Sequence, residues 1–168
     1  FVAGRQPDGN TVLLRGRDGL VVFDTGRHAG HTQRIIDAAR SARVPVVAIV
    51  NSHWHLDHVS GNAALRDAYP QAQVYASDAI AGAMSGFLAD YRAQLRQMLD
   101  HAAVDDAGIV GWREELARID SGTKLFPTHP VSAPQPLTLA GRRLQLGLER
   151  NAVSGGDVWM LDRRTGVL

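Results

Sequence analysis

The sequence predicts an α/β fold in which β-strands and helices pack as layers around one core. Strand-like segments lie toward both ends of the chain, and amphipathic helical segments fill its middle. A continuous apolar run, Val46–Val50, is typical of a strand that is covered on both faces. The 168 residues, 45% of them hydrophobic, suffice for one domain with a sizeable core and leave little room for a second. We therefore treat residues 1–168 as a single domain.

The first half of the chain is expected to alternate strands and helices. Two aliphatic and β-branched runs are separated by glycines and an aspartate, which is the spacing of a β-hairpin. Two later segments carry apolar side chains at helical spacing, and each ends close to a proline, which disfavours helix in the residue before it. In chain order the expected elements are strands 11–15 and 20–24, helix 31–43, strand 46–50, helix 60–69 and strand 73–76.

The second half is expected to continue with helices and then return to strands. An apolar stripe of helical period begins after Ser77 or Asp78, either of which can cap a helix. A stripe of this period belongs to the core far more often than to a ligand cavity, and residues 77–120 are interpreted as a helical insertion that frames the substrate cleft. The expected elements are helices 77–103 and 106–119, a proline-rich loop 126–136, strands 137–139, 142–148 and 158–161, and the start of a strand at 167.

Composition and charge exclude several classes of protein. The formal net charge is +1, and the arginines are scattered without a basic stripe, so no nucleic-acid partner is expected. There is no cysteine, so any metal must be bound by histidine and carboxylate. No run approaches the ~18 apolar residues of a membrane span, and we expect a soluble protein that acts on a small molecule. Because the first residue is Phe1 and not Met, export to the periplasm with removal of a leader is one of the possibilities for this protein. The sequence does not indicate the oligomeric state.

The strongest chemical signal is a cluster of histidines. His53, His55 and His58 fall within six residues together with Asp57, and chance produces His-x-His-x-Asp-His roughly once in a thousand chains of this composition. The cluster follows the strand Val46–Val50 and precedes a helix, the sheet edge where α/β proteins commonly bind ligands. Imidazole and carboxylate without sulfur suit zinc first, with manganese, iron or nickel as alternatives. The competing interpretation is a histidine-rich turn that caps the helix.

Two segments of the chain resemble motifs of the metallo-β-lactamase-fold hydrolases. Residues 51–62, NSHWHLDHVSGN, are similar to the metal-binding motif at a strand end, and residues 21–26, VVFDTG, are similar to the strand before it. With the later start of a strand at Gly156-Asp157, the resemblance extends from Gly9 to Leu168. It implies an αββα sandwich with a metal site along one edge, here as an incomplete version of a fold that usually runs longer.

The resemblance also implies roles for individual residues. His53 and His55 would bind a first zinc ion, and Asp57 and His58 a second. A hydroxide shared by the metals would attack an ester, thioester, lactam or similar bond, because zinc lowers the pKa of bound water toward ~7. Asp57 is also the candidate catalytic residue, since it could orient the nucleophile or accept its proton. Asp24 is interpreted either as holding the metal loop through hydrogen bonds or as a simple turn former.

One family ligand is missing from the sequence. The family takes a third histidine for the first metal from a Gly-His-Thr/Ser-x-Gly-Asp segment, and here Val153 or, with a two-residue shift, Asn151 stands at that position. Neither equals an imidazole. The alternatives to a hydrolase are therefore a degenerate member that binds one metal or a ligand without turnover, and an α/β interaction domain with an accidental histidine loop.

Four further histidines could complete the site. His28 and His31 follow the Asp-Thr-Gly turn on the same sheet edge, although residues at the start of a helix are more often solvated. His129 lies between prolines, and His101 lies in the last turn of a predicted helix, where it complements the helix dipole.

Overall fold

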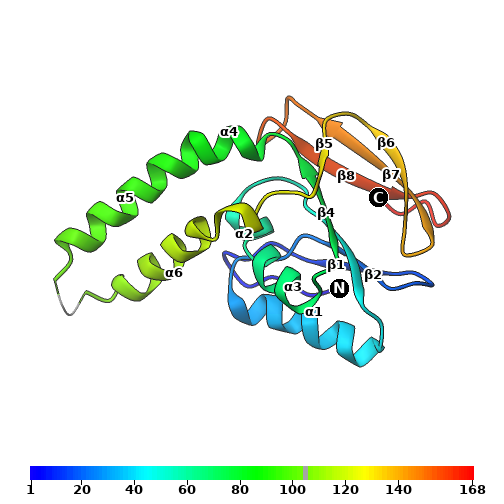
Figure 1. The fold of residues 1–168 in the computed structure, drawn as a ribbon, viewed down its shortest axis with the longest axis horizontal. Coiled ribbons are helices and arrows are strands. Elements are labelled where there is room, and N and C mark those ends of the chain that lie inside the picture. Colours follow the sequence, from blue (N-terminus) through cyan, green and yellow to red (C-terminus); the bar gives the residue numbers. More distant parts are fainter. Residues whose placement is uncertain (104–105) are drawn as a thin grey trace.

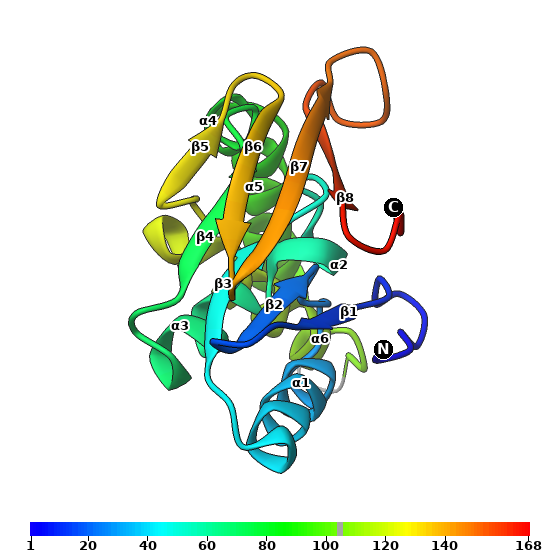
Figure 2. The same ribbon diagram turned by 90° about the vertical axis from the view of Figure 1, so that its right-hand side faces the viewer.

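The computed structural model describes residues 1–103 and 106–168, and it arranges their strands in two β-sheets (Figures 1 and 2). The larger sheet has the order β1-β2-β3-β4-β5, and the smaller has the order β6-β7-β8. Their facing sides share one apolar cluster that contains Val21, Val50, Leu144 and Leu146. The predicted layered α/β sandwich is thereby confirmed.

The larger sheet begins with a hairpin and continues with parallel strands. β1 (Val12–Arg15) pairs antiparallel with β2 (Leu20–Phe23), as predicted. β3 (Val46–Val50), β4 (Gln73–Ser77) and β5 (His129–Val131) then add in parallel. Because β2, β3 and β4 run in the same direction, the loops that leave their carboxyl ends meet at one edge of the sheet.

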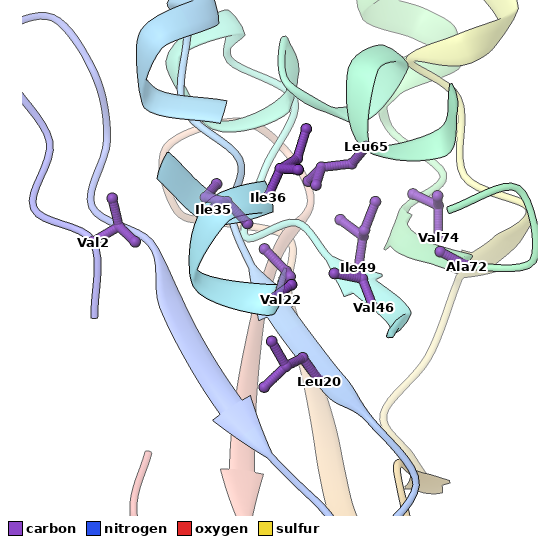
Figure 3. Close-up of a cluster of buried hydrophobic side chains, with 11 residues drawn as sticks. Val2, Leu20, Val22, Ile35, Ile36, Val46, Ile49, Leu65, Ala72 and Val74 are labelled. Atoms are coloured by element: carbon purple, nitrogen blue, oxygen red, sulfur yellow. The ribbon is translucent and has the colours of Figure 1, made fainter. Parts of the chain in front are cut away.

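Helices cover the outer face of this sheet. α1 (Ala29–Ala42) and α3 (Asn62–Ala68) contact each other and place Ile35, Ile36 and Leu65 against the strand residues Val22 and Ile49 (Figure 3). The close-up shows these side chains meeting between the helices and the sheet. α1 begins two residues before the expected start and ends at Ala42, with Arg43 in the left-handed conformation that commonly ends a helix.

The smaller sheet is antiparallel throughout. β6 (Gln135–Leu139), β7 (Arg142–Glu149) and β8 (Asp157–Asp162) extend the expected strands by one or two residues. The strand expected to start at Val167 is a single bridge between Val167 and Asp162.

The predicted long helix over residues 77–103 is wrong. The chain forms α4 (Ile80–Ser85) and α5 (Phe87–His101), because the backbone leaves the helical conformation at Gly86. α6 (Ile109–Asp120) packs beside α5, and this pair of helices projects away from the sheets (Figure 1). None of the helices in the described residues has the length and apolar character that a membrane crossing needs.

Two shorter segments also differ from expectation. The helix predicted over residues 60–69 is α3, and a short helix that was not expected, α2 (Leu56–Val59), precedes it inside the histidine cluster. The proline-rich stretch expected to be a loop contains β5, and the short 3-10 helix η1 (Gly122–Lys124) precedes it. β5 is an edge strand, where Pro130 needs no N–H on the outer side.

Candidate metal centre

The structure brings the predicted metal ligands together at the carboxyl edge of the larger sheet. His53 and His55 lie in the loop between β3 and α2, and Asp57 and His58 lie in α2. The ring centroid of His53 is 4.5 Å from that of His55 and 4.1 Å from that of His58. The Asp57 Oδ2 atom is 3.0 Å from His58 Nε2. Four potential ligands therefore form one cluster.

Asp24, the residue that follows β2, fixes the histidine loop from the neighbouring strand. Its side chain is buried, and its carboxylate accepts hydrogen bonds from the Ser52 N–H (2.7 Å), the Ser52 hydroxyl (2.8 Å) and His58 Nδ1 (2.8 Å). Since Nδ1 of His58 donates to this carboxylate, its Nε2 is the nitrogen that faces Asp57. Asp24 also has a left-handed backbone, with φ 61°. Asp24 therefore holds the histidine loop through hydrogen bonds and also forms a turn, so the two roles considered for it from the sequence are both present.

Ser52 orients His53 in a similar way. Because the single hydroxyl proton of Ser52 goes to Asp24, its oxygen accepts from His53 Nδ1 at 2.9 Å. The Nε2 of His53 then carries the lone pair. Ser52 had no signal in the sequence beyond its position before His53, and its role was missed.

The backbone of His58 is held by buried polar groups. Its carbonyl oxygen accepts hydrogen bonds from the Thr25 N–H (2.9 Å), the Thr25 hydroxyl (3.0 Å) and Asn51 Nδ2 (3.1 Å). Asn51 and Asn62, both fully buried, also bond to each other through their side-chain amides. His58 is thus fixed through both its ring and its main chain.

Burial and neighbouring charges shift the pKa values of two histidines in opposite directions. Burial lowers the pKa of His53, and the neighbouring rings of His58 and His55 lower it further. Burial also opposes the charged form of His58, but the carboxylates of Asp24 and Asp57 outweigh it and raise the pKa of His58. His53 is therefore favoured as the neutral imidazole, the form that binds metals.

The second sheet contacts the histidine loop through the turn before β8 and through the start of β8. The indole N–H of Trp54 donates to the Ser154 carbonyl oxygen (2.9 Å), and the Val158 N–H donates to the Ser52 carbonyl oxygen (2.6 Å). Val153, in the same turn, is 71% exposed, and Asn151 is exposed as well. This turn, which the structure describes in full, directs neither candidate third ligand into a buried position.

The remaining histidines lie outside the cluster. His31 is buried, contrary to the expectation that residues at the start of the helix are solvated, and its Nε2 is 2.7 Å from the Thr11 hydroxyl. His28 is partly exposed, and its Nδ1 is 3.1 Å from Asp8. His129 stacks on Tyr75 in the edge strand. His101 contacts the carbonyl oxygen of its own helix at Gln97 through Nδ1 (2.8 Å) and is exposed.

The donor set fits a divalent cation by its chemistry. Within the described residues, no group of three or more His, Asp or Glu side chains is arranged to hold one ion. However, an imidazole nitrogen and a carboxylate oxygen meet at Asp57 and His58, and His53 presents a second nitrogen beside them. The far nitrogens of His53 and His58 are already bonded to Ser52 and Asp24, as is usual behind metal-ligating histidines.

A cleft opens beside these residues. It has a volume of about 290 Å³, and polar groups from the histidine loop share its walls with aromatic and aliphatic groups from the start of α5. The lining residues are Arg27, Trp54, His55, Leu56, Asp57, Phe87, Leu88 and Tyr91. Arg27 is ion-paired with the buried Glu115 of α6 at 2.6 Å, which joins the helical region to the sheet edge.

This fold, with its histidine loop at the sheet edge, is that of a known class of enzymes. The model of the metallo-beta-lactamase superfamily matches residues 4–143, and the chain belongs to that family. An (R)-specific secondary-alkylsulfatase from Pseudomonas sp. is 30% identical over 164 residues, which are 94% of this chain and 24% of that protein. A hydroxyacylglutathione hydrolase from Gloeobacter violaceus is 38% identical over 74 residues, or 39% of this chain and 29% of that protein. The chain thus spans about a quarter of the length of these relatives.

Solved structures share the fold. The sec-alkylsulfatase Pisa1 from Pseudomonas sp. aligns over 92% of this chain and 26% of its own, with 22% identity and a TM-score of 0.61. A metallo-beta-lactamase-like protein from Thermotoga maritima aligns over 90% of this chain and 60% of its own, with 11% identity and a TM-score of 0.57. At these identities the likeness concerns the fold alone.

Proposed function

We propose that this protein is a metal-dependent hydrolase in which His53, His55, Asp57 and His58 hold one or two zinc ions. The observation that carries the proposal is the convergence of these side chains at the sheet edge, with His53 and His58 each fixed from behind by Ser52 or Asp24. Membership of the metallo-beta-lactamase superfamily supports it. When bound, zinc would lower the pKa of water toward ~7 and supply a nucleophile at neutral pH.

The chain's own residues would orient the reaction. Asp24 and Ser52 keep the Nε2 atoms of His58 and His53 available as ligands. Asp57 is 32% exposed and lines the cleft, so its carboxylate is placed to orient an attacking water and to accept its proton.

We further propose that the substrate is an ester of an apolar alcohol, with a secondary alkyl sulfate as the first candidate. The likeness to the alkylsulfatase covers 94% of this chain, whereas that to the hydroxyacylglutathione hydrolase covers 39%. The cleft supports an apolar group: the Phe87 side chain is 64% exposed there, and its ring centroid is 5.7 Å from Trp54 and 6.3 Å from Tyr91. Aromatic surfaces of this kind bind apolar ligands.

Metal content and hydrolysis test the proposal together. After dialysis against zinc, the wild-type protein should retain zinc by elemental analysis, and His53→Ala should retain less. His101→Ala is the matched control, because His101 is exposed at the end of α5, outside the cluster. EDTA should lower the melting temperature, since an ion that binds the folded state stabilises it. An EDTA-insensitive melting temperature with no retained zinc would refute the metal site.

The substrate is tested on the zinc-loaded protein with a secondary alkyl sulfate, a hydroxyacyl glutathione thioester and a chromogenic β-lactam. The first should be hydrolysed fastest, and Phe87→Ala should raise its KM more than it lowers kcat, because Phe87 would contact the apolar part of the substrate and not the reacting bond. Preference for either other substrate would refute the alkyl sulfate assignment and leave the hydrolase proposal standing.

A second candidate function is metal or ligand binding without turnover. The observation that favours it is that Val153 and Asn151, the two residues that could stand at the family's third histidine position, carry no imidazole and are exposed. It predicts at most one weakly held zinc ion and no hydrolysis of the three substrates. Asn151→His and, separately, Val153→His should then raise zinc affinity at whichever position faces the site.

A further inference from the structure

Asp24 is held in its unusual backbone conformation by groups on both sides. Its N–H donates to the Val50 carbonyl oxygen (2.9 Å), and its own carbonyl oxygen accepts from the Thr11 hydroxyl (2.9 Å). A non-glycine residue with φ 61° has a strained backbone, which persists only where its surroundings determine it. The Thr11 hydrogen bond is therefore one of the contacts that keep the Asp24 carboxylate against His58.

Thr11 is in turn oriented by His31. Thr11 is fully buried, and because its one hydroxyl proton goes to Asp24, its oxygen must accept from His31 Nε2 at 2.7 Å. His31 Nδ1 then accepts from the Arg34 guanidinium at 3.2 Å. The hydrogen bonds thus run in one direction, from Arg34 through His31 and Thr11 to the carbonyl oxygen of Asp24.

His31 also holds the far end of the same turn. Its ring lies against Gly26, where a Cβ would be 2.3 Å from His31 Cδ2. Gly26 has φ +75°, so it adopts a left-handed conformation in addition to leaving room for the ring. A single buried side chain of α1 therefore contacts the turn at one end and, through Thr11, supports it at the other.

We propose that His31 and Thr11 are positioning residues for the metal centre, which act by holding Asp24 so that its carboxylate fixes the ring of His58. They would touch neither metal nor substrate. This role presupposes the proposed metal site for its functional meaning, but the chain of hydrogen bonds is a property of the metal-free protein. It gives a function to a histidine that lies outside the metal-binding motif.

Thr11→Val and Thr11→Ser form the decisive pair of variants. Valine has nearly the shape of threonine without its hydroxyl, and serine keeps the hydroxyl. In the metal-free wild-type protein, imidazole 15N–1H NMR should show a hydrogen-bonded proton on His58 Nδ1, the nitrogen that faces Asp24. Thr11→Val should lose this signature and bind Co²⁺ about 10–100-fold more weakly in competition with a chelator, whereas Thr11→Ser should keep both properties.

His31→Gln and His31→Leu provide an independent pair if Thr11→Val does not fold. The glutamine amide can donate to Thr11 and accept from Arg34, so Gln should preserve the His58 signature and Leu should lose it. Equal NMR spectra and equal Co²⁺ affinities within each pair would overturn the inference. If the wild-type protein binds no Co²⁺, the proposed function fails, and the NMR comparison still decides whether His31 and Thr11 position Asp24.

Discussion

Asp24→Asn is expected to separate the role of the carboxylate charge from that of the turn. The amide keeps the size of the side chain and tolerates a left-handed backbone, so the turn itself should persist. One amide oxygen can still accept from the Ser52 N–H. The amide N–H₂ group, however, then faces the Ser52 hydroxyl and His58 Nδ1, where the carboxylate accepted two hydrogen bonds.

The size of the effect follows from these contacts. Hydrogen bonds to a buried charged group contribute about 1.5–3 kcal/mol each, so losing two gives roughly 3–6 kcal/mol. Relief from burying a charge offsets part of this loss. We expect the free energy of unfolding to fall by about 2–4 kcal/mol, less than the total stability of a typical domain. The neutral His58 ring should also change tautomer, with its proton on Nε2 and its lone pair on Nδ1, which would weaken metal binding through Nε2.

Urea unfolding of the metal-free protein measures the first effect, and zinc competition measures the second. Asp18→Asn is the matched control, since Asp18 is exposed and its carboxylate pairs with the exposed Arg17, and it should change stability by less than about 0.5 kcal/mol. If Asp24→Asn were as mild as Asp18→Asn in both assays, the Asp24 carboxylate would not be what fixes His58.

Three further perturbations follow from the structure. Glu115→Gln removes the buried partner of Arg27 and should destabilise the chain by roughly 3 kcal/mol in urea unfolding; an unchanged midpoint would contradict this. Burial opposes the charged form of Asp8, but hydrogen bonds from neighbouring backbone N–H groups outweigh it and lower the pKa of Asp8. The ionised carboxylate therefore stabilises the fold above about pH 3.9, and this stabilisation is lost as the pH falls through the lowered pKa. The difference in unfolding free energy between wild type and Asp8→Asn should shrink from pH 5 to 2.5, and a constant difference would refute this. Gly61→Ala places a Cβ 2.4 Å from a backbone oxygen and should lower the free energy of unfolding by about 2–3 kcal/mol. Gly82→Ala should instead stabilise the chain by up to ~1 kcal/mol, because Gly82 lies within α4 and a Cβ there meets open space. Thermal unfolding measures both effects.

The strands and the metal-binding motif were accessible from the sequence because their signals are local. The five apolar residues of β3 suffice to predict a strand buried on both faces, and the structure confirms it. The spacing of His53, His55, Asp57 and His58 placed these residues at the end of that strand. Their assignment as metal ligands stays a prediction, supported by how closely their side chains gather.

The errors arose where contacts distant in sequence decide the structure. β5 has three residues and a proline, so no alternation marks it, and it is a strand because it pairs with Tyr75–Ser77 of β4. The buried ring of His31 bonds to Thr11, twenty residues earlier in the chain. The end of α4 at Gly86 does carry a local signal, but the continuous apolar stripe concealed it.

The contact of the histidine loop with β8 has a consequence for folding. The loop belongs to the larger sheet, yet Trp54 and Ser52 bond to Ser154 in the turn before β8 and to Val158 at the start of β8, in the smaller sheet. Docking of the second sheet therefore adds two hydrogen bonds to the loop that carries the four clustered side chains. An ion bound by residues 53–58 would hold this loop in one shape, and through the hydrogen bonds of Trp54 and Ser52 it would favour the docked arrangement of the two sheets.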